Sequence, residues 1–146
     1  MNRQSWRALI AGLRHDWSAH ELSDQFLWKE GLSSATPEEA WERIHGAHGL
    51  WAMFQNAQIM LEMAEFAART SDSIEPSVLE TLRDNAEQIR LYVLKAVDEY
   101  ASSQATESVQ ENAFCAAFMY TRMAARMTRL LQDHAATALP DFVAAM

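Results

Sequence analysis

Apolar residues recur at spacings of three and four along most of this chain, which is the period of amphipathic α-helices. The pattern predicts helices over residues 2–16, 19–30, 37–69, 76–103 and about 106–136. No segment shows the strict alternation of a half-buried strand. Because three long helices with short links must pack antiparallel, we predict an all-α fold: an antiparallel helical bundle of three long helices plus an N-terminal helical pair.

The predicted bundle is one domain over residues 1–146, and 146 residues are enough to bury a core without disulfides or metals. No internal repeat or linker divides the chain. The prediction places the N-terminal helical pair in residues 1–31, the three long helices in 37–136 and a tail in 137–146, where Pro140 ends the apolar pattern.

The clearest helix start lies at Thr36–Glu39. Thr36 can cap the first turn, Pro37 suits the first helical position, and Glu39 completes a capping box. The predicted helix runs to about Arg69, and its apolar positions form an a/d seam that consists of Ala47, Leu50, Phe54, Ala57, Leu61, Ala64 and Ala68.

The charge balance narrows the classes of partner. Twelve basic and twenty acidic side chains give a net charge of −8, which disfavours nucleic acid and anionic membrane surfaces as partners. No uninterrupted apolar stretch reaches the length of a transmembrane helix, and no secretory signal is visible. The single Cys115 lies in an apolar run and is expected to be a buried, inert thiol. These features favour a cytoplasmic protein.

Two glycines and two histidines share about one and a half turns of the longest predicted helix, within Ile44-His45-Gly46-Ala47-His48-Gly49. Each mid-helix glycine costs roughly 1 kcal/mol relative to alanine, so the pair needs a reason. One reason is that a glycine one turn from a histidine leaves the imidazole accessible. The other is that Gly46 and Gly49 allow close helix packing, with histidines that are surface or satisfied core residues.

The segment resembles the histidine-containing phosphotransfer family, whose signature is a histidine, a variable residue, an apolar residue, a lysine, a glycine and, five residues later, an aromatic residue or leucine. The matching residues are His45, Gly46, Ala47, His48, Gly49 and Phe54. His48 stands where the family has lysine, and Gln55 replaces a glycine that is common there. The resemblance implies that His45 carries a phosphoryl group, with His48 as a helper or rival, and that a receiver domain or kinase docks over Gly46 and Gly49.

Neutral imidazole is a nucleophile, so an exposed helical histidine needs no catalytic apparatus of its own to accept a phosphoryl group. In that case the partner supplies the aspartate and Mg²⁺. We therefore expect this chain to hold no cofactor and, at most, to act as a phosphocarrier.

A second class of function competes with phosphotransfer: a non-catalytic helical adaptor, chaperone or regulator that acts by protein–protein interaction, with a homodimer as one possible form. Regular heptads on the last two helices and five tryptophans favour it, since surplus apolar faces can pair between chains. Arg122, Arg126 and Arg129 line one face of the last helix near its C-terminus. They suit the helix dipole, or they form a docking strip for an acidic partner.

Two sets of acidic residues and histidines have spacings close to those of metal ligands, and we expect neither to bind a metal. Glu62 and Glu65, followed by Glu80 and Asp84, resemble the Mg²⁺ ligands of the all-α nucleotide pyrophosphohydrolases of the MazG and dimeric dUTPase type, but the second pair is one residue too far apart. Glu42, His45 and His48 could start a di-iron site, but the second Glu-x-x-His that such bundles need is missing.

Overall fold

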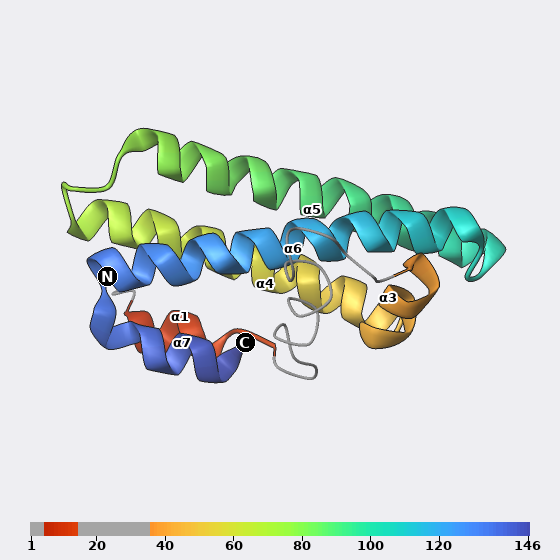
Figure 1. The fold of residues 1–146 in the computed structure, drawn as a ribbon, viewed down its shortest axis with the longest axis horizontal. Helices are drawn as coiled ribbons and strands as arrows, with labels where there is room; N and C mark the ends of the chain where they lie inside the picture. Colours follow the sequence, from red (N-terminus) through yellow and green to blue (C-terminus); the bar gives the residue numbers. More distant parts are fainter. Residues whose placement is uncertain (1–4, 15–35) are drawn as a thin grey trace.

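The computed structural model describes residues 5–14 and 36–146, which form helices and no strand. The prediction of an all-α helical bundle is confirmed. Three long helices make up its body, α4 (Ala47–Thr70), α5 (Pro76–Ser103) and α6 (Glu107–His134), and consecutive ones run in opposite directions (Figure 1). The shorter elements are α1 (Trp6–Ala11), α3 (Pro37–Arg43), the 3₁₀ turn η1 (Ala136–Ala138) and α7 (Leu139–Ala145).

The core lies where the apolar stripes of α4, α5 and α6 meet. Its largest buried side chains on these helices are Leu50, Met53, Met60, Met63, Leu82, Ile89, Tyr120 and Met123. The seam predicted for α4 differs at alternate positions. Met53 and Met60 are buried, whereas the expected Phe54 and Leu61 are half-buried at the edge of the core.

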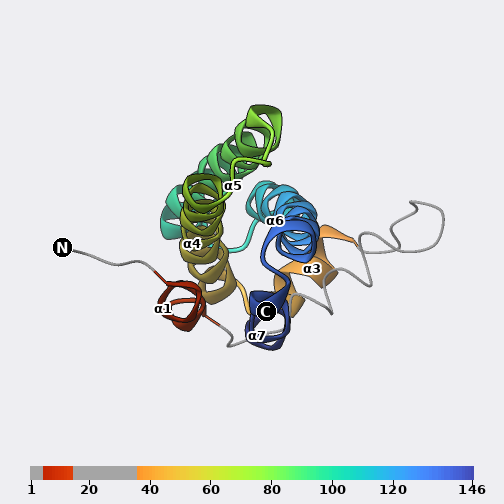
Figure 2. The ribbon, with the colours of Figure 1, turned by 90° about the vertical axis from the view of Figure 1, so that its left-hand side faces the viewer.

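Short helices cover the remaining side of the three-helix body. At the end where α5 meets α6, α3 packs on α6, and the rings of Trp41 and Tyr100 lie 5.3 Å apart. At the other end α1 and α7 lie side by side, and Trp6 packs edge-on against Phe66 at 4.8 Å (Figure 2). Segments from opposite ends of the chain therefore share the position that a fourth long helix would take.

The continuous helix predicted over 37–69 is in fact two helices that meet at a corner. Thr36 caps α3 as expected, since its hydroxyl accepts from the Glu39 N–H at 3.1 Å. After Arg43 the N–H of His45 donates to the Glu42 carbonyl, and the N–H of Gly46 donates to the Trp41 carbonyl. These two bonds are those of a Schellman motif, which ends a helix with a left-handed residue. The glycines mark this corner and do not lie mid-helix.

The helices predicted over 76–103 and about 106–136 agree closely with α5 and α6, although α6 ends at His134 and not near residue 136. In the tail, Pro140 lies in the first turn of α7, where its missing N–H costs nothing, so the chain forms a final short helix there. At the N-terminus α1 ends at Ala11, short of the predicted 16. The predicted helix over 19–30 lies outside the described residues.

Candidate functional site

The corner between α3 and α4 places His45 at the surface, outside either helix. Its φ of 62° lies in the left-handed region, which is the conformation that the Schellman motif requires after Ile44. The side chain is exposed, while the preceding Ile44 is fully buried. The histidine expected on a flat helical face is therefore presented by a tight turn.

The two glycines serve the packing of this turn. Gly46 has a φ of 62°, and a Cβ there would lie 3.1 Å from the Trp41 ring. Gly49 is buried, and a Cβ there would lie 1.8 Å from the carbonyl oxygen of Ile44. Gly49 thus lets the first turn of α4 approach the backbone of Ile44. It has this packing role in place of the open docking face expected beside a histidine.

His48 lies in the first turn of α4, exposed and next to the end of the N-terminal segment. Nη2 of Arg14 lies 3.3 Å from its Nε2 and 3.5 Å from its Nδ1. The His48 ring is therefore engaged by a guanidinium. His45 and His48 are both exposed near the corner. Among the residues that the structure describes, a guanidinium lies beside the His48 ring and not beside His45.

A buried polar cluster beside the corner was not predicted. The Asn56 amide accepts from the Arg14 N–H at 2.7 Å and donates to the Arg14 carbonyl at 2.8 Å and to the Tyr120 hydroxyl at 3.0 Å. Tyr120 in turn donates to Sδ of Met146 at 3.8 Å. Burial raises the pKa of Tyr120, and its bond from Asn56 opposes that rise. The Asn56 side chain therefore binds both the N–H and the carbonyl of Arg14, as the backbone of an adjacent strand would.

The acidic candidates do not gather into a metal site. Glu65 lies 3.6 Å from Arg83 of α5, so this carboxylate has a cation as its neighbour. Across residues 5–14 and 36–146 the structure holds no group of three or more side chains placed to bind a metal ion. Glu42, His45 and His48 likewise do not form such a group.

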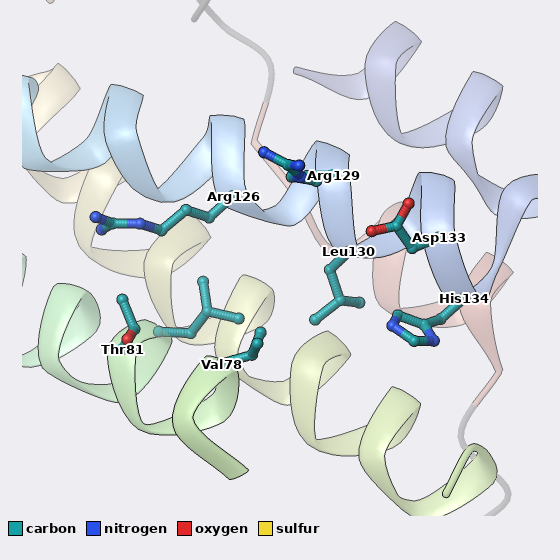
Figure 3. A pocket seen from close by; sticks show the side chains of 8 residues that line it. Val78, Thr81, Arg126, Arg129, Leu130, Asp133 and His134 are labelled. Carbon is teal, nitrogen blue, oxygen red and sulfur yellow. The ribbon is translucent and has the colours of Figure 1, made fainter. Parts of the chain in front are cut away.

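A groove of about 310 Å³ lies between the start of α5 and the end of α6, and we call it the α5–α6 groove (Figure 3). Apolar side chains form its floor and charged or polar ones its rim. The lining residues are Val78, Thr81, Leu82, Arg126, Arg129, Leu130, Asp133 and His134. Val78, Thr81, Arg129 and Asp133 are exposed, so the groove is open to solvent along its rim.

The groove gathers two of the three predicted arginines. Nη1 of Arg126 donates to the side-chain oxygen of the buried Asn85 at 2.5 Å, which fixes its guanidinium at one end of the groove. Arg129 lies one turn further along α6, on the rim. Arg122 lies elsewhere, with its guanidinium 5.5 Å from the centre of the Phe118 ring. Neither Arg126 nor Arg129 forms an ion pair with a carboxylate in the described parts of the chain.

The far end of the groove is closed by His134, whose Nδ1 lies 3.1 Å from the Ser73 hydroxyl in the α4–α5 loop. Asp133 stands beside it on the rim. Its spacing of four residues from Arg129 permits an ion pair, but the two side chains do not form one. The sequence reasoning found the arginines and missed Asp133, His134 and the apolar floor. Antiparallel pairing of α5 and α6 was the signal that could have joined them.

Comparison of the chain with protein-family models, with curated proteins and with solved structures found no match. Within the described residues, no helix combines the length and the apolar character that crossing a membrane requires.

Proposed function

We propose that this protein is a non-catalytic helical interaction module, an adaptor or regulator that binds an acidic segment of a partner protein in the α5–α6 groove. One observation carries the proposal: Arg126 and Arg129 flank an apolar floor, and neither is paired with a carboxylate in residues 5–14 or 36–146. In a chain of net charge −8 with twenty carboxylates, two such arginines one helical turn apart place positive charge along the groove.

The composition of the groove supports this assignment. Arginine is enriched at the centres of protein interfaces, because its planar head group binds a carboxylate through two parallel hydrogen bonds. The bond from Arg126 to Asn85 orients one of these head groups in advance, which lowers the entropy lost on binding. Val78 offers an exposed apolar contact in the groove, above the buried Leu82 and Leu130. A partner segment that carries a carboxylate next to an apolar side chain would complement this groove.

The test is an NMR titration of the isotope-labelled full chain with two amphipathic helical peptides that share their apolar residues. One peptide carries glutamates on its polar face and the other lysines. We expect the acidic peptide to shift the amides of residues 78–82 and 126–134, and the basic peptide to leave them in place. The Arg126→Gln/Arg129→Gln double variant should lose at least about tenfold in affinity, since hydrogen bonds to charged groups contribute about 1.5–3 kcal/mol.

Arg122→Gln is the matched control, because Arg122 is an exposed arginine of the same helix outside the groove. It should bind the acidic peptide like the wild type. Equal binding by the double variant and the wild type, or shifts confined to another face, would refute the proposal.

Phosphoryl transfer on His45 is the second candidate, and the exposure of its imidazole at the corner favours it. The expected readout is a phosphoryl group that moves from a phosphorylated receiver domain to this chain. His45→Gln should abolish the transfer and His48→Gln should preserve it. Unchanged labelling of the His45→Gln variant would exclude His45 as the acceptor.

A further inference from the structure

The α5–α6 groove carries charges of both signs in a fixed order along α6. Arg126 stands at one end, Asp133 near the other and Arg129 between them on the rim, and the buried Leu82 and Leu130 form the apolar floor. Arg126 and Asp133 are seven residues apart, which is two turns or about 10 Å of helix. Attraction of an acidic partner explains the two arginines, but it gives Asp133 no role.

We infer that the groove selects a two-turn helical segment with a carboxylate at one end, an apolar side chain in the middle and a basic group seven residues from the carboxylate, and that Asp133 sets this preference. This inference rests on the proposed function of the groove. It names the partner as an amphipathic helix of mixed charge, which should bind more tightly than a uniformly acidic segment.

The shape of the groove favours a helical segment of a larger molecule over a small ligand. Sites for small molecules enclose most of their ligand, whereas here Val78 is 40% exposed and both Arg129 and Asp133 stand on an open rim. The walls are two antiparallel helices, and a third helix laid along such a groove inserts side chains at i, i+3, i+4 and i+7. That period places one charge near Arg126 and another near Asp133.

Asp133 acts mainly by exclusion. Arg129 is four residues away and does not neutralise it by direct contact, so a second carboxylate on the ligand would face an exposed negative charge. A ligand lysine at the same point would gain a rim ion pair. Rim ion pairs are worth at most about 1 kcal/mol, so the preference for lysine over glutamate should be about threefold to fivefold.

The experiment uses the full chain and three synthetic helical peptides that differ at one position. Each carries a glutamate, a leucine pair one turn later and, seven residues after the glutamate, a lysine, a glutamine or a glutamate. Affinity for the wild type should fall in that order, as measured by fluorescence anisotropy. Asp133→Asn should bring the three affinities together. Asp98→Asn, a change of an exposed aspartate on α5 outside the groove, should keep the wild-type order.

The possible results separate this inference from the proposed function. If all three peptides bind and their order is absent in the wild type or unchanged in Asp133→Asn, the charge selection is refuted while the groove remains a docking site. If none of them binds, the proposed function fails and the inference fails with it.

Discussion

Replacement of Gly49 by alanine tests the corner most directly, because two physical effects predict opposite signs. Gly49 lies in the first turn of α4, where helix propensity alone would make alanine more stable by about 1 kcal/mol. The structure predicts a loss, since the new Cβ would lie 1.8 Å from the carbonyl oxygen of Ile44 and 2.6 Å from its carbonyl carbon. These are backbone atoms, so no side-chain rotation relieves the overlap.

The magnitude follows from what must move. Ile44 is fully buried, and displacing it overpacks the core, which costs about 1–3 kcal/mol. The two Schellman hydrogen bonds to Trp41 and Glu42 would be strained as well, at about 1 kcal/mol each if lost. After the gain in propensity the net loss is about 2–4 kcal/mol, which lowers the melting temperature by roughly 5–15 °C for a chain of this size.

The assay is thermal and urea denaturation followed by far-UV circular dichroism. Gly12→Ala is the control: its Cβ would lie 3.3 Å from Cδ1 of Ile59, the end of a flexible side chain, and should change stability by less than about 1 kcal/mol. A Gly49→Ala variant as stable as the wild type would show that α4 does not approach Ile44 this closely.

Three further changes address other parts of the molecule. His45→Gly should stabilise the chain by about 0.5–1 kcal/mol in urea denaturation, because glycine adopts a positive φ without steric cost, and a destabilised variant would contradict the left-handed corner. Because burial raises the pKa of Tyr120, the unfolded chain loses that proton first, and stability should fall by about 1.4 kcal/mol per pH unit above about pH 10. Tyr120→Phe should lack this part of the slope, and equal slopes would refute it. Asn56→Leu should lower the free energy of unfolding by about 3 kcal/mol and accelerate hydrogen exchange at the Arg14 amide, since both backbone groups of Arg14 lose their partner. Unchanged exchange would show that the hydrogen bonds between Asn56 and the Arg14 backbone are absent.

The period of the apolar residues was sufficient to predict the long helices. The glycines at the corner were not sufficient to predict where the helix breaks. Helices α5 and α6 begin at or within one residue of the starts predicted from the apolar spacing, at 76 and about 106. Apolar spacing continues on both sides of His45-Gly46 and therefore predicts a helix interior at this pair. The pair His45-Gly46 after Arg43 also fits a helix C-terminal cap, which contains a residue of positive φ. Because Ile44 is apolar and buried, the apolar pattern continues across this helix end.

The candidate site was predictable only in part, for a related reason. The spacing of Arg126 and Arg129 on one helical face is visible in the sequence, but their shared groove depends on the register between α5 and α6. Asn85 and Asn56 are polar residues inside apolar stripes, and a sequence pattern does not reveal which atoms will satisfy them. Long-range hydrogen bonds of this kind are set by packing, and no local preference encodes them.

The sharing of one bundle position by α1 and α7 has a consequence for the order of folding. Most contacts among α4, α5 and α6 join consecutive helices, so mainly short loops must close before they form. Contact between α1 and α7 joins segments from opposite ends of the chain, and its loop-closure entropy is correspondingly larger. The three long helices should therefore assemble first, and the two short ones should dock last and open first. An early intermediate would already contain the α5–α6 groove.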